Sequence, residues 1–176
     1  MSTTSVARRS TVAVPLIAGA AAAVALGVYG RLHDPTGVAI DIAGFSSFQA
    51  VKTWLATLAA VLGVLQLVTA AALYRGRPQL APLHRWSGRA AVLVTLPVVA
   101  HCLYALGFQY GEPRVLIHSL LGCFFYGAFV VKMLALTRVG APSWLLPVAG
   151  GAVFTGLIGL WLTSALWFFT TFGVIR

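Results

Sequence analysis

The chain has 176 residues, of which 60% are hydrophobic and only 9% are charged, with a formal net charge of +9. A water-soluble domain carries roughly 25% charged residues, so this composition excludes an ordinary soluble protein. The apolar residues gather in blocks of about 20 residues or more, the length that crosses a bilayer. The sequence therefore predicts an all-α integral membrane protein.

Five transmembrane helices in an up-down bundle are expected, and together they use most of the chain. Their approximate ranges are 11–30, 50–74, 83–107, 113–137 and 144–171. No room remains for a soluble domain, so residues 1–176 are expected to form a single transmembrane domain. The first block follows "ARRS" but is too long for an ordinary signal core, which favours an uncleaved signal anchor.

The positive charges predict the orientation of the bundle. With the N-terminus in the cytoplasm, the inner side receives most of the cations: Arg8, Arg9, Arg75, Arg77, Arg85, Arg89, Lys132 and Arg138. This asymmetry follows the positive-inside rule and predicts a multi-pass protein of the bacterial cytoplasmic (inner) membrane. Because topology explains the net charge, nucleic-acid binding is disfavoured.

All three acidic residues then lie on the outer side, so no span carries a carboxylate at depth. An ion-coupled transporter is therefore disfavoured, since such proteins place ionisable groups along their pathway. The outer loop at 31–49 is long and contains exposed apolar residues, which indicates a segment on the membrane surface or a docking site. The last span is rich in small residues, and we expect it to serve helix packing.

Two short stretches place a glycine four residues after a histidine: "HRWSG" at 84–88 and "HSLLG" at 118–122. A third histidine, His101, lies nine residues before Tyr110, while His118 lies eight residues after it. If the outer turn is centred near Tyr110, the two rings lie at nearly the same depth, about 8–12 Å from the turn. Two level imidazoles on neighbouring antiparallel helices are suited to ligate one metal centre.

A b-type haem needs a flat space, imidazole ligands for its iron and cations for its propionates. Gly122 leaves a notch one turn below His118, and Arg114 stands one turn above it. The sequence thus predicts haem b ligated by His118 and His101, beside Gly122 and Arg114. The alternatives are histidines that hydrogen-bond across helix interfaces, a quinone contact, or another metal. Zinc and copper are disfavoured because Cys, Asp and Glu do not cluster at that depth.

His84 lies about 25 Å from His101 along the helix, and therefore on the other side of the membrane. With Gly88 it either holds a second haem or faces the lipid head groups beside Arg85 and Arg89. His33, in the outer loop, is expected to be exposed to solvent and not to be a ligand. Cys102 and Cys123 are expected to be small core residues, and no C-x-x-C-H motif for covalent haem attachment occurs.

The stretch "HSLLG" resembles the H-S-x-L-G stretch of cytochrome b561-like membrane proteins. The stretch "HRWSGR" is similar to the H-R-x-x-G-R stretch of several small haem-bearing membrane families, ferric-reductase-like domains among them. The resemblance covers only the second to fifth spans. It implies a helical bundle that binds haem b non-covalently, with His118 as the foremost axial ligand, His101 next and His84 as a candidate. That family supplies two histidine pairs from four helices, whereas the second and fifth spans of this chain contain no histidine.

The sequence therefore predicts a membrane-embedded b-type cytochrome that transfers electrons as an oxidoreductase component. One haem b is expected, and a second haem is left open. Its expected partners are the lipid bilayer, a quinone or redox protein at the outer face, and a homo-oligomer or larger membrane complex. The alternative is a cofactor-free accessory subunit that scaffolds such a complex.

Overall fold

The computed structural model of the chain describes residues 3–37 and 47–174. The main helices are α1 (Thr3–Leu32), α2 (Phe48–Tyr74), α3 (Ala81–His101), α4 (Pro113–Thr137) and α5 (Leu145–Trp161). Three further segments extend them: the 3₁₀ turn η1 (Pro78–Leu80) precedes α3, the π-helical turn η2 (Cys102–Leu106) continues α3, and the π-helical turn η3 (Leu162–Leu166) with α6 (Trp167–Phe172) continues α5.

Five of these helical stretches are long and apolar enough to cross a membrane: Thr11–Leu32, Phe48–Tyr74, Pro78–Leu106, Pro113–Thr137 and Leu145–Phe172. Their ends lie within a few residues of the ranges expected from the sequence. The predicted all-α fold with five transmembrane helices is confirmed, and the protein is a multi-pass membrane protein. Much of the expected surface segment in the outer loop, residues 38–46, lies outside the described residues.

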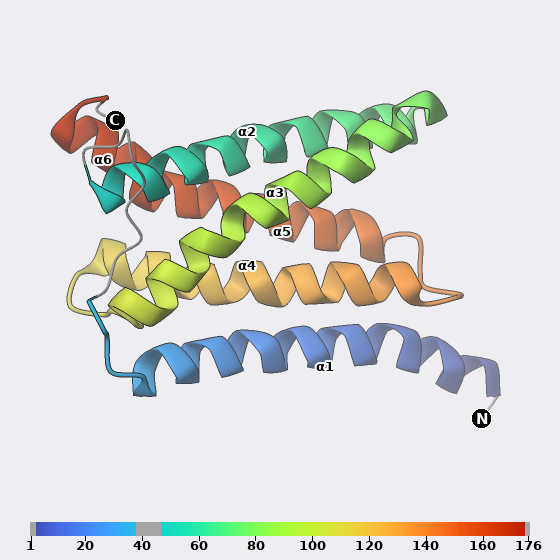
Figure 1. The fold of residues 1–176 in the computed structure, drawn as a ribbon. Helices are drawn as coiled ribbons and strands as arrows, with labels where there is room; N and C mark the ends of the chain where they lie inside the picture. Colours follow the sequence, from blue (N-terminus) through green and yellow to red (C-terminus); the bar gives the residue numbers. More distant parts are fainter. Residues whose placement is uncertain (1–2, 38–46, 175–176) are drawn as a thin grey trace.

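The helices do not pack in chain order. In space α1 packs on α4, α4 on α5, α5 on α2, and α2 on α3 (Figure 1). The helix α3 crosses the others obliquely, and in the described part of the chain its contacts with α4 are sparse. One bridge between them is the Tyr126 hydroxyl, which donates to Thr95 Oγ1 at 3.1 Å. The consecutive helices α3 and α4, expected to be antiparallel neighbours, are thus joined by a short turn and diverge away from it.

The helix boundaries follow local chemistry. The Ser47 side chain accepts a hydrogen bond from the Ala50 amide and thereby caps the start of α2. Pro113 opens α4 at a position where a missing N–H group costs nothing. Gly107 ends η2 with a φ of 68°, a conformation that side chains disfavour, and lets the Phe108 amide donate to the Gly30 carbonyl. The end of α1 is thereby joined to the turn that follows η2.

Small residues allow the closest helix contact in the bundle. A Cβ atom added to Gly19 of α1 would lie 2.6 Å from the Gly127 carbonyl oxygen of α4. In the reverse direction, a Cβ atom on Gly127 would lie 2.7 Å from the Gly19 carbonyl oxygen. Lipid tails are as apolar as leucine, so membrane helices associate through such close backbone approach and not through the hydrophobic effect. The α1–α4 contact therefore depends on both glycines.

Candidate functional site

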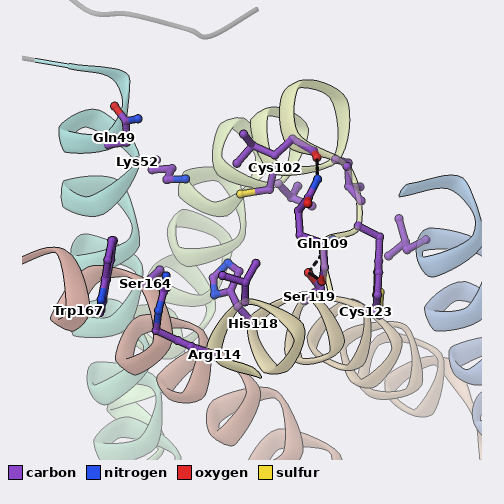
Figure 2. A pocket seen from close by; sticks show the side chains of 18 of the residues that line it. Gln49, Lys52, Cys102, Gln109, Arg114, His118, Ser119, Cys123, Ser164 and Trp167 are labelled. Carbon is purple, nitrogen blue, oxygen red and sulfur yellow. Dashed lines mark hydrogen bonds between the residues drawn. The ribbon is translucent and has the colours of Figure 1, made fainter. Parts of the chain in front are cut away.

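A cavity of about 260 Å³ lies between the start of α2, the end of α3 with η2, the start of α4, and η3 with α6 (Figure 2). A second cavity of about 90 Å³ lies beside it, deeper in the bundle. Both are bordered by the same six residues: Val99, Cys102, His118, Gly122, Tyr126 and Ser164. Ligand sites typically occupy about 300–1,000 Å³, and the two adjoining spaces together reach that range.

His118 stands at the junction of the two cavities, and its ring is oriented by Thr163 of η3. The distance between His118 Nδ1 and Thr163 Oγ1 is 2.9 Å. Thr163 Oγ1 also lies 2.8 Å from the Gly159 carbonyl oxygen of its own helix. If the hydroxyl proton is donated there, Oγ1 accepts from His118, Nδ1 carries the imidazole proton, and Nε2 keeps its lone pair. This is the protonation pattern of a histidine that is ready to ligate a metal through Nε2.

Gly122 leaves open space one turn along α4 from His118. A Cβ atom added there would meet only Leu160 Cδ2, at 4.0 Å. The position borders both cavities, so the missing side chain contributes directly to the space beside the imidazole. The notch expected from the sequence at Gly122 is present.

Two cations border the larger cavity at its polar end, as Figure 2 shows. The Arg114 guanidinium donates to the Thr163 carbonyl at 2.8 Å and to the Glu112 carboxylate at 3.4 Å. Its central carbon also lies 3.9 Å from the centre of the Trp167 ring. Arg114 was expected to pair with a haem propionate, and in the structure it contacts the carboxylate of Glu112. Lys52 of α2 also borders the cavity, and its side chain extends away from α2 (Figure 2).

His101 does not border either cavity. Its side chain is 6% exposed and packs on Phe48, with a ring-centre distance of 5.2 Å. Its Nε2 atom is buried without a hydrogen-bond partner among the described residues. The next residue, Cys102, borders both cavities instead, because one residue along a helix turns the side chain by about 100°. The structure thus does not bring His101 to the cavity that His118 faces.

No group of three or more His, Cys, Asp and Glu side chains within residues 3–37 and 47–174 is arranged to hold a metal ion. The two cysteines differ from the expectation that they only fill the core. Cys102 borders both cavities and Cys123 borders the larger one, and both thiols are free.

The surroundings of His84 are filled. Its Nδ1 atom lies 2.8 Å from Thr69 Oγ1 of α2. The Gln66 amide donates to the His84 carbonyl and, at 2.7 Å, to the Ser87 hydroxyl. A Cβ atom added to Gly88 would lie 3.0–3.3 Å from three side-chain atoms of Gln66. The notch expected at Gly88 is therefore occupied by a side chain of the neighbouring helix.

His33 is half-buried, not solvent-exposed as expected. Its ring stacks between Tyr29 and Tyr104, with ring-centre distances of 5.2 and 5.1 Å. Its Nε2 atom also lies 3.2 Å from the Tyr104 carbonyl oxygen. These contacts tie the end of α1 to η2, which is a structural role on one side of the cavity.

Sequence reasoning missed the part that the fifth span plays at this site. Thr163 contacts both His118 and Arg114, although 45 residues separate it from the histidine. The only available signal was the presence of hydroxyl-bearing residues in an otherwise apolar span. Lys52, near the start of α2, was likewise not assigned to the site.

Comparison with curated proteins gives no match, and comparison with solved structures gives none. A protein-family model described as a family of unknown function, DUF6529, matches residues 12–176. That match includes both histidine–glycine stretches and almost the whole membrane domain. The chain therefore belongs to the DUF6529 family.

Proposed function

We propose that the chain is a membrane-embedded b-type cytochrome that binds one haem b non-covalently in the cavity between α3 and α4. His118 supplies an axial ligand through Nε2. The observation that carries the proposal is an open cavity beside an imidazole whose Nδ1 lies 2.9 Å from Thr163 Oγ1, so that Nε2 is the atom left for a ligand. The resemblance of "HSLLG" to cytochrome b561-like proteins supports the same residue.

The residues around the cavity fit a flat tetrapyrrole. The open position at Gly122 lets a planar ring approach α4 beside the imidazole. Apolar side chains such as Val99, Leu103 and Val115 supply the walls. Lys52 and Arg114 supply positive charge at the polar end, where it offsets the two carboxylates that a haem carries.

Haem iron supplies one-electron chemistry, cycling between the ferric and ferrous states. The chain's own residues determine where and how this occurs. His118 would hold the iron through Nε2, and the apolar side chains that line the cavity would limit the access of water to it. Water exclusion and ligand identity are among the main features by which a protein tunes a haem potential.

His101 is proposed as the second axial ligand, a role that its buried Nε2 supports. An unsatisfied buried polar nitrogen costs about 1–3 kcal/mol, and ligation would remove that cost. Such ligation requires the His101 ring to turn from Phe48 toward the cavity. The proposal is limited to one haem because Gln66 occupies the space at Gly88.

The electron partners proposed are a quinone or a redox protein that approaches the end of the bundle nearest the cavity. By the positive-inside rule this is the outer side of the bacterial cytoplasmic membrane, with the N-terminus in the cytoplasm. Assembly with a second copy or with a larger membrane complex would place such a partner permanently at the cavity.

The direct test is the haem content of the protein purified in detergent from haem-replete cells. We expect a Soret band, a sharp α band after dithionite reduction, and about one haem b per chain by pyridine haemochromogen assay. A colourless protein under these conditions contradicts the proposal and favours the cofactor-free accessory subunit.

A further inference from the structure

We infer that Thr163 is a positioning residue of this site. It orients the iron ligand His118 and, at the same time, holds the guanidinium group of Arg114 at the border of the cavity. The inference rests on the proposed function and extends it to a residue of the fifth span. It follows from four contacts of one residue, three through its hydroxyl group and one through its carbonyl group.

The hydroxyl group fixes the imidazole. Thr163 Oγ1 donates to the Gly159 carbonyl at 2.8 Å, with the Leu160 carbonyl at 3.2 Å as a second acceptor. Its lone pairs then face His118 Nδ1 at 2.9 Å. With the hydroxyl proton donated to its own helix, this contact requires the tautomer with a proton on Nδ1, and that tautomer leaves Nε2 as the ligand atom. A threonine bound in this way to its own helix is a rigid acceptor.

The carbonyl group accepts a hydrogen bond from Arg114 within the π-helical turn. In a regular α-helix the Trp167 amide would donate to the Thr163 carbonyl four residues earlier. Here the Trp167 amide donates to the Ser164 carbonyl. The Thr163 carbonyl instead accepts from Arg114 Nη1 at 2.8 Å. Such π-helical turns are frequent at functional sites, and this one presents a backbone acceptor to the neighbouring helix.

His118 and Arg114 lie one turn apart on α4, so both contacts fix the same face of that helix. The ligand ring and the cation are thereby held in one geometry by a single residue of η3. An acceptor for the second ring proton raises the basicity of a ligating histidine, and its loss typically lowers metal affinity by about 10- to 100-fold. Thr163 thus acts on the iron site through His118 without touching the haem.

The chain offers a matched control in the same C-terminal extension. Thr170 Oγ1 donates to the Leu166 carbonyl at 3.0 Å, and the hydroxyl groups of Thr163 and Thr170 therefore share the same bond to their own helix. Thr170 is exposed and does not border the cavity. Thr163→Val and Thr170→Val therefore remove the same chemical group, but only the first removes the contact with His118.

The first experiment measures the imidazole tautomer by ¹⁵N NMR of histidine-labelled protein without haem, with His118→Gln used to assign the signals. We expect the Nδ1-protonated tautomer of His118 in the wild type, in Thr163→Ser and in Thr170→Val. In Thr163→Val that preference should be lost. An Nε2-protonated ring in the wild type, or an unchanged tautomer in Thr163→Val, overturns the inference.

The second experiment uses the haem-loaded protein and measures haem dissociation and the reduction potential. We expect Thr163→Val to lower haem affinity by about 10- to 100-fold and to raise the potential, because the less basic ligand stabilises ferric iron less. Thr163→Ser should restore both quantities. Equal values in Thr163→Val and Thr170→Val overturn the inference. A wild type that binds no haem overturns the proposed function, and the tautomer measurement then still decides whether Thr163 orients His118.

Discussion

The two histidine–glycine stretches are alike in sequence and alike in how their rings are held. His118 Nδ1 contacts Thr163, and His84 Nδ1 contacts Thr69, at 2.9 and 2.8 Å. Each threonine also donates to a carbonyl group of its own helix. The difference lies at the glycine, because Gly122 borders open space whereas Gly88 is covered by Gln66.

The comparison teaches that a glycine leaves space for a ligand only where no side chain of a neighbouring helix fills that space. The helix α3 packs on α2 along its first part, and α2 supplies both Gln66 and Thr69 to the region around His84. Farther along, α3 crosses away from α2 toward the start of α4 (Figure 1). The space beside His118 is left as a cavity there. The same spacing is therefore a polar packing contact in one place and a cavity in the other.

The largest expected effect comes from removing each histidine in turn. His118→Ala should abolish haem binding, because it removes the imidazole that faces the cavity. His84→Ala should keep the full haem content, since its ring contacts Thr69 and borders neither of the two cavities. Absorption spectra and haemochromogen assays of both variants check this. A haem lost from His84→Ala, but retained in His118→Ala, would reverse the comparison.

The next effect comes from filling the two glycine positions. In Gly122→Leu the new side chain enters the cavity, and overpacking of about 1–3 kcal/mol should lower haem affinity by roughly one to two orders of magnitude. In Gly88→Leu the same side chain meets Gln66, so the cost falls on folding: the free energy of unfolding should drop by about 1–3 kcal/mol with haem content per folded chain unchanged.

Haem titration and unfolding in mixed micelles measure the two quantities on both glycine variants. The comparison requires that the two substitutions affect different quantities. If Gly88→Leu and Gly122→Leu lowered haem affinity equally, the distinction between an open and a filled notch would be wrong.

The smallest expected effect comes from Gln66→Ala, which opens the filled notch. The variant removes two hydrogen bonds to α3, to the His84 carbonyl and the Ser87 hydroxyl. Interhelical hydrogen bonds in membranes contribute modestly, so the free energy of unfolding should fall by about 1 kcal/mol. Haem content should stay at the wild-type level. A second haem in Gln66→Ala would show that only Gln66 separates the two sites.

The sequence predicted much of the fold and part of the candidate site. Composition and the length of the apolar blocks were sufficient for five transmembrane helices, because crossing a bilayer sets a minimum apolar length. The spacing within α4 placed His118, Gly122 and Arg114 on one side of a single helix, and all three border the cavity. Contacts within one helix follow from its period, which the sequence contains.

What the sequence did not predict depends on which helices meet. A helix that is apolar on every side gives no periodic signal of its packing face, so the order α1, α4, α5, α2, α3 was not readable. Depth along the helix put His101 level with His118, but its rotation toward Phe48 was decided by packing. The open space at Gly122, the filled space at Gly88 and the contact from Thr163 likewise arise only when separate helices come together, because each depends on a side chain from another part of the chain.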